Sequence, residues 1–238
     1  MHAVEMGEQT DASRPVFVLV HGLGMSSSYM LPTGRLLSVW GKVYVPDLPG
    51  FGKSGKPSRI LTISELADSL AEWMAAHAFK SPVLIGNSLG AQVIVDFAVR
   101  HRARLTAAVL VGLTVDPEAR RMSSQIGRLL SDVPREPPGL YGIAVSDYFR
   151  AGVVRCLQTL RHALNDPIAE KLPAIRVPVL VVRGEHDPLV PQRWSERAAG
   201  LAPDASCVTI PGAAHAVNFS APEALVREVM KFMGAEDF

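Results

Sequence analysis

The chain has 238 residues, which suits one large domain or one domain with an insertion. Hydrophobic residues make up 48% and charged residues 20%, a composition typical of a folded enzyme and unlike that of a disordered chain. The 24 basic and 23 acidic residues nearly cancel, and the basic ones are scattered among few aromatics, which argues against a nucleic-acid partner. No apolar run has the length of a membrane span.

The N-terminal segment is polar and mixed in charge, so it does not have the pattern of a signal peptide. The two cysteines, Cys156 and Cys207, offer neither a disulfide framework nor the spacing of a metal site. We therefore expect a cytoplasmic protein with free thiols and no bound metal.

Residues 1–14 are predicted to form a mobile tail or one short edge strand. The continuous apolar run 15–20 then predicts a strand buried on both faces. It ends in His21-Gly22-Leu23-Gly24, a turn that could direct backbone N–H groups into a crevice or simply connect a strand to a helix.

A short helix is expected over residues 31–40 and the next strand over 43–45. A loop rich in proline and glycine follows, and its Asp47 is more typical of a carboxylate that binds loop amides than of a catalytic group. Ser64 is expected to cap a helix that runs to about residue 79.

Residues 82–102 contain the sharpest local signal in the chain. An apolar strand leads into Gly86-Asn87-Ser88-Leu89-Gly90, and helical periodicity begins directly afterwards. A G-x-S-x-G motif alone is weak, but between a buried strand and an amphipathic helix it predicts a nucleophilic serine on a tight turn. Gly86 and Gly90 would let the strand and the helix approach closely.

After a strand at 107–111, residues 113–174 no longer alternate between strand and helix patterns. This stretch carries several prolines with helical apolar stripes between them, which predicts an all-helical cap. We therefore divide the chain into a core of residues 1–112 and 175–238 and a cap of residues 113–174.

The alternation resumes with strands at 178–182 and 206–210 and helices at 194–201 and 222–233. Six strands separated by helices predict an α/β fold with a mostly parallel, doubly wound sheet. Asp187 and His215 each follow a strand at its carboxyl end, the edge where open parallel sheets build their sites.

An acyl-transfer serine needs a base and a carboxylate that orients the base. The order Ser88, Asp187, His215 supplies them, and the backbone N–H groups of Leu23 and Leu89 are the candidate oxyanion donors. Asp116, which follows the strand after the serine, is a rival for the acid.

Five motifs taken together, HGLG, DLPGFGKS, GNSLG, GEHDPLVP and PGAAH, resemble the α/β-hydrolase superfamily from about residue 15 to the C-terminus. The resemblance implies a Ser–His–Asp hydrolase that uses no cofactor and has a helical cap over its pocket. Only about 14 residues precede the strand that leads into the HG turn, fewer than usual, so the sheet should be trimmed at its N-terminal edge. A second copy of the chain could pair with that edge as a homodimer.

The leading hypothesis is hydrolysis of carboxylic esters of small to medium apolar substrates through an acyl-enzyme. Asn87 before the serine also resembles the subgroup that cleaves carbon–carbon bonds in ring-cleavage products, although that subgroup usually has glycine where Ala91 stands. Dehalogenation and epoxide opening are disfavoured because those branches carry aspartate as the nucleophile. A different class, a small-molecule receptor on the same fold, stays open because a receptor can retain the triad.

Overall fold

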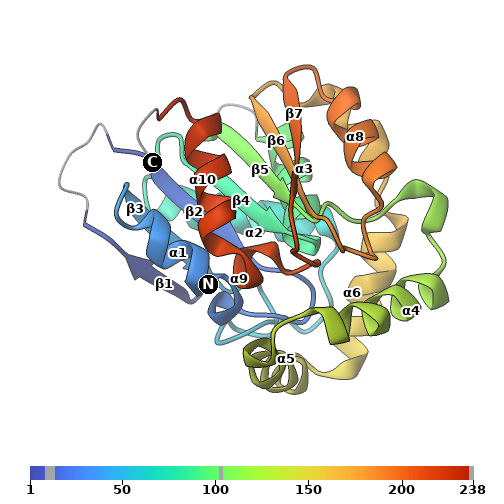
Figure 1. Ribbon diagram of the computed structural model, residues 1–238. Helices are drawn as coiled ribbons and strands as arrows, with labels where there is room; N and C mark the ends of the chain where they lie inside the picture. The colour runs from blue at the N-terminus through green and yellow to red at the C-terminus, as the bar shows by residue number, and fades with distance from the viewer. Residues whose placement is uncertain (9–13, 102–103, 236–238) are drawn as a thin grey trace.

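The computed structural model describes residues 1–8, 14–101 and 104–235 (Figure 1). Its described strands form a single sheet, and from the N-terminus they are β1 (Ala3–Met6), β2 (Val16–Val20), β3 (Lys42–Pro46), β4 (Val83–Asn87), β5 (Ala107–Val111), β6 (Val179–Gly184) and β7 (Ala205–Ile210). Their order across the sheet is β1-β3-β2-β4-β5-β6-β7.

Every neighbouring pair in the sheet is parallel except β1 and β3, which are antiparallel. The predicted doubly wound, mostly parallel α/β sheet is therefore confirmed. The short edge strand, one of the two alternatives predicted for residues 1–14, is also present as β1, whereas residues 9–13 lie outside the described residues.

The central strands are buried on both faces. All five residues of β4 and of β5 are buried, as are all six of β6. In β2, Val18 and Val20 belong to one apolar cluster while Phe17 and Leu19 belong to another. Because successive side chains of a strand point to opposite faces, the two clusters are the two sides of the sheet. This explains why these strands read as unbroken apolar runs.

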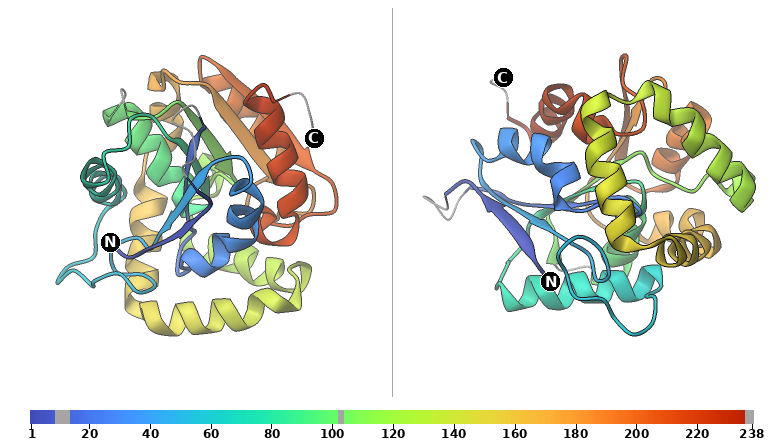
Figure 2. Two further views of the ribbon diagram at one scale, coloured as in Figure 1. Left: turned by 90° about the vertical axis from the view of Figure 1, so that its left-hand side faces the viewer. Right: turned by 90° about the horizontal axis from the view of Figure 1, so that it is seen from below.

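Helices cover both faces (Figures 1 and 2). On one side lie α2 (Ile63–Ala76), α3 (Leu89–Arg100) and α8 (Gln192–Leu201). On the other side lie η1 (Ser27–Met30), α1 (Leu31–Leu37), α9 (Val217–Ser220) and α10 (Pro222–Phe232). The element ends differ from the sequence-based expectations by a few residues, the usual uncertainty of helix termini.

The cap of α2 corrects one prediction. Thr62, and not Ser64, is the N-cap: its side chain accepts a hydrogen bond from the Glu65 N–H, and the Glu65 carboxylate accepts the Thr62 N–H at 2.9 Å. Ser64 lies inside the helix and donates to Asp96 at 3.0 Å. The capping box uses two backbone groups where a Ser64 cap would use one, which is why the helix begins earlier.

Between β5 and β6, where every residue is described, the chain is helical and carries no strand. The elements there are η3 (Pro117–Ala119), α4 (Met122–Asp132), η4 (Val133–Arg135), α5 (Pro138–Ala151), α6 (Val153–Asn165), α7 (Ile168–Lys171) and η5 (Leu172–Ala174). In Figure 1, α4, α5 and α6 gather at one end of the strands, below the sheet. No helix in the described part of the chain is long and apolar enough to cross a membrane.

Candidate active site

Ser88 lies at a strained corner between β4 and α3. Its backbone angles are φ 55° and ψ −115°, a conformation that residues other than glycine rarely adopt. The Ser88 N–H donates to the Val111 carbonyl at 2.8 Å, which fastens the corner to the neighbouring strand β5. Strain of this kind persists only where the surrounding structure enforces it, and it is common at functional sites.

Two glycines make the corner possible. A Cβ on Gly90 would lie 2.2 Å from the Val20 carbonyl oxygen, and one on Gly86 would lie 2.5 Å from the Gly90 carbonyl carbon. Both contacts are with backbone, which cannot move aside as a flexible side chain can. The close approach expected from the sequence is therefore confirmed at both positions.

The corner stands at a reversal in the winding of the sheet. Strand β2 pairs with β3 on one side and with β4 on the other. The connection after β2 therefore leads to one side of the sheet, and the connection after β3 leads to the other. Such a switch point opens a crevice at the carboxyl ends of the strands. Leu23, after β2, and Leu89, the first residue of α3, both line the cavity that occupies this position. As the first residue of a helix, Leu89 has no intrahelical acceptor for its N–H.

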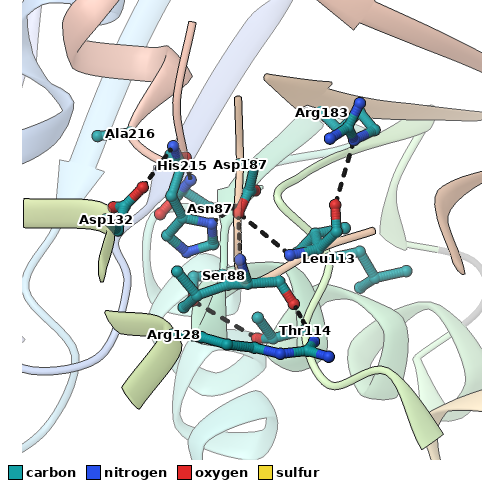
Figure 3. A network of polar contacts seen from close by, with 12 residues as sticks. Asn87, Ser88, Leu113, Thr114, Arg128, Asp132, Arg183, Asp187, His215 and Ala216 are labelled. Atoms are coloured by element: carbon teal, nitrogen blue, oxygen red, sulfur yellow. Dashed lines mark hydrogen bonds and ion pairs between the residues drawn. The ribbon is translucent and has the colours of Figure 1, made fainter. Parts of the chain in front are cut away.

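His215 and Asp187 are brought together from the loops after β7 and β6. His215 Nδ1 lies 2.8 Å from Asp187 Oδ2, and both side chains are buried (Figure 3). The other carboxylate oxygen of Asp187 accepts the N–H groups of Leu189 at 2.8 Å and Val190 at 3.1 Å. The carboxylate is thus held on both sides, and it in turn sets the orientation of the imidazole.

The second ring nitrogen of His215, Nε2, is buried and has no hydrogen-bond partner among the described residues. Ser88 Oγ lies 3.5 Å from Thr114 Oγ1, and Ser88, Thr114 and His215 all line the same cavity. His215 and Ser88 thus border one cavity, and Nε2 is the ring nitrogen that Asp187 does not use. Catalytic hydrogen bonds of this type often tighten only when substrate is bound.

The electrostatic surroundings of His215 favour its protonated form. Burial opposes the charge on the ring, but the negative charge and hydrogen bond of Asp187, with further contributions from Asp132 and Glu136, outweigh it. Together they raise the pKa of His215 to about 9.

The cavity has a volume of about 260 Å³, and most of its lining is apolar. Its apolar and aromatic walls come from both the sheet edge and the helical insertion: Leu23, Met25, Tyr29, Leu89, Val115, Ile126, Leu129, Leu130, Val133, Leu140, Tyr141, Ala144, Tyr148, Leu160, Ala163, Leu189 and Ala216. Such a site suits an apolar ligand oriented by a few polar groups.

The rival candidate for the acid, Asp116, is buried, and its carboxylate binds groups other than His215. Its side chain caps η3 by accepting the Glu118 N–H at 3.0 Å, and it pairs with Arg193 at 3.2 Å. Asp187 is the carboxylate that contacts His215. Of the two candidates for the acid, Asp187 is therefore the one that lies against the imidazole.

The other polar residues singled out in the sequence have structural partners. Asp47 accepts the N–H groups of Ser27 at 2.6 Å and Lys53 at 2.8 Å, as expected for a carboxylate that binds loop amides. His21 donates from Nδ1 to the Gly22 carbonyl, and its Nε2 accepts the Leu48 N–H. Burial lowers the pKa of His21, which keeps the ring neutral in this role.

Sequence reasoning missed several polar residues at the cavity. Asn87, noted only as a possible subgroup marker, donates from Nδ2 to the His215 carbonyl at 3.1 Å and accepts the Tyr29 hydroxyl at 3.0 Å. Asp132 and Glu136, from the helical insertion, also line the cavity. Their spacing of four residues on a helical segment resembles an ordinary solvated face, so the sequence carried no signal for them.

Within residues 1–8, 14–101 and 104–235, no cluster of three or more His, Cys, Asp or Glu side chains could hold a metal ion. Both cysteines are free thiols, with Cys156 buried and Cys207 exposed.

Comparison with known proteins finds hydrolases of similar sequence and fold. The RutD protein of a Caulobacter strain, provisionally named a carbamate hydrolase, is 27% identical over 261 residues, covering 99% of this chain and 96% of its own. The 2-(acetamidomethylene)succinate hydrolase of Mesorhizobium japonicum is 26% identical and covers 98% and 92%. The crystal structure of the enol-lactonase from Burkholderia xenovorans shares the fold, with a TM-score of 0.83, 22% identity and coverage of 98% and 96%. A sequence profile of the alpha/beta hydrolase family matches residues 17–228, and the chain therefore belongs to the alpha/beta hydrolase family.

Proposed function

We propose that the protein hydrolyses carboxylic esters of small to medium apolar substrates through an acyl-enzyme. The observation that carries the proposal is the convergence of Ser88 at its strained corner and the Asp187–His215 pair on one largely apolar cavity. The same constellation supports acyl transfer on many folds, so the geometry of the site supports this activity more strongly than the fold does.

The chemistry follows from the placement of the groups. His215 Nε2 takes the proton from Ser88 Oγ as this oxygen attacks the ester carbonyl carbon, and Asp187 stabilises the resulting imidazolium. The N–H groups of Leu23 and Leu89 would bind the oxyanion of the tetrahedral intermediate. His215 then protonates the leaving alcohol, and water that it activates releases the acid and restores Ser88.

Carbon–nitrogen hydrolysis is a second candidate, because two relatives aligned over nearly the whole chain bear names of carbamate and acetamido-compound hydrolases. The triad chemistry is shared, and only the leaving group differs. Carbon–carbon hydrolysis is the third candidate, and the Asn87 side chain that suggests it joins Tyr29 to the His215 carbonyl.

Hydrolysis of a series of p-nitrophenyl esters, from acetate to laurate, tests the proposal. We expect multiple turnover on the shorter acyl chains, a fall as the chain outgrows the cavity, and loss of turnover in Ser88→Ala with an unchanged circular dichroism spectrum. No turnover by the folded wild-type protein on any chain length would refute ester hydrolysis. A single turnover that leaves a stable adduct on Ser88 would favour a receptor.

The pH dependence of ester hydrolysis is expected to report His215. Because the neutral ring must accept the Ser88 proton and its pKa is raised to about 9, kcat/KM should rise about tenfold per pH unit below that value and then level off. Initial rates with isoamyl butyrate in a pH-stat would measure this profile. A midpoint near 6.5, the ordinary histidine value, would contradict the expectation.

A further inference from the structure

Two carboxyl groups from the helical insertion face the same cavity as the triad. Asp132 is the last residue of α4, and Glu136 follows η4 one turn later. Both line the cavity and are almost fully buried, with 5% of Asp132 and 6% of Glu136 exposed. Figure 3 shows Asp132 directly beside His215. Both acids contribute to the raised pKa of His215, but the triad chemistry itself requires only one carboxylate, Asp187.

The two carboxyl groups use only part of their capacity to accept hydrogen bonds. Asp132 Oδ1 accepts the His215 N–H at 3.4 Å, and Glu136 Oε1 accepts the Ala216 N–H at 2.6 Å. Glu136 Oε2 is buried without a hydrogen-bond partner among the described residues. An unsatisfied buried carboxylate oxygen is costly, so a ligand that donates to it would recover the lost free energy.

The cavity lining offers these acids little positive charge. Among the described residues that line it there is neither a lysine nor an arginine, and His215, whose positive charge is favoured there, is hydrogen-bonded to Asp187. Burial, with the nearby Asp132 charge, raises the pKa of Glu136 to about 7, and burial also raises the pKa of Asp132. A positive charge bound beside them would therefore lower the pKa of both carboxyl groups and favour their negatively charged forms.

Aromatic rings complete the surroundings. Tyr29, Tyr141 and Tyr148 line the same cavity, so a cation held near the acids would also lie within an aromatic enclosure. Aromatic rings attract cations that have left water, and methylated amines in particular. A carboxylate ligand would meet only negative charge from Asp132 and Glu136.

We propose that Asp132 and Glu136 form a cation subsite that selects esters whose alcohol portion carries a protonated amine. The inference rests on the proposed ester hydrolysis. The alcohol side is indicated because both acids bind the backbone at His215 and Ala216, beside the ring that must protonate the leaving alcohol. The unpartnered Glu136 Oε2 is the acceptor for the amine N–H.

Three butyrate esters of similar size test the subsite: dimethylaminoethyl butyrate, which is protonated at neutral pH, its uncharged isostere isoamyl butyrate, and the anionic butyryloxypropanoate. For the wild-type protein we expect kcat/KM to be about tenfold or more higher for the cationic than for the uncharged ester, and lowest for the anionic one. In Glu136→Gln the ratio of cationic to uncharged ester should fall to about one. The glutamine side chain retains an oxygen for the Ala216 N–H, so the loop stays held.

The matched control is Glu72→Gln, which removes the same charge from an exposed position on α2. It should leave the wild-type ratio unchanged. Equal kcat/KM for the cationic and uncharged esters in the wild type, or a preference that survives in Glu136→Gln, would overturn the subsite while ester hydrolysis stands.

A binding measurement tests the subsite independently of the proposed reaction. In Ser88→Ala, calorimetry should show tighter binding of the cationic ester than of its isostere. Because the pKa of Glu136 is about 7, binding at pH 7 should release about half a proton per molecule. This result would support the subsite even if the wild type hydrolysed none of the esters, an outcome that would refute only the proposed reaction. Equal binding without proton release would overturn the subsite.

Discussion

The Asp187→Asn variant is expected to lose about 10⁴-fold in kcat for ester hydrolysis. The amide oxygen of the substituted side chain can still accept the Leu189 and Val190 N–H groups, which turns its NH₂ group toward His215 Nδ1. That nitrogen must then accept, so the ring proton moves to Nε2, the position that has to receive the Ser88 proton. The loss therefore arises from the wrong tautomer of His215, and steady-state rates would measure it.

Asp116→Asn is the matched control for this loss. Asp116 is also buried and also follows a strand, but its partners are the Glu118 N–H and Arg193. We expect kcat to stay within a few-fold of the wild type. Equal thermal unfolding of the two variants would exclude a general loss of folding. If Asp116→Asn lost activity and Asp187→Asn kept it, the acid would have been assigned to the wrong residue.

Gly90→Ala is expected to destabilise the fold by at least ~3 kcal/mol, at or above the upper range for overpacked substitutions. The new Cβ would lie 2.2 Å from the Val20 carbonyl oxygen and 2.8 Å from that of His21. Both oxygens belong to the central strand β2 and its turn, so relief requires α3 to move off the sheet. Denaturant unfolding would measure the change, and any folded remainder should have lost activity because Ser88 moves with α3.

Gly127→Ala provides the contrasting substitution. Gly127 is an exposed residue in the middle of α4, and a Cβ there would meet nothing within 4 Å. Alanine should stabilise the helix by up to ~1 kcal/mol because it loses less backbone entropy on folding. Equal effects of the two substitutions would show that helix propensity, and not the contact with β2, determines the importance of Gly90.

Several features could be predicted from the sequence because they depend on short segments. Unbroken apolar runs mark strands buried on two faces, and β4, β5 and β6 are fully buried. The corner at Ser88 was predictable because the motif and both flanking periodicities lie within a single short stretch, residues 82–102. The antiparallel edge strand β1, by contrast, was only one of two expectations, since four residues carry too little pattern.

Other features depended on contacts that no local pattern encodes. Threonine and serine are both good N-cap residues, so Thr62 and Ser64 were both candidates. The path of the chain into α2 places Thr62 at the N-cap. Asp116 and Asp187 both follow strands, and only the position of the β7–α9 loop showed that His215 contacts Asp187.

The sequence by itself determined the buried strands and the strand–turn–helix corner at Ser88, because the residues within each short segment decide those features. Only the tertiary structure showed which carboxyl groups surround His215. Asp132 lies 83 residues before His215 in the chain, and Glu136 lies 80 before Ala216, yet both reach this loop through the packing of the helical insertion over the strand ends. Charges that far apart in sequence interact only once folding has brought them together and removed the water between them.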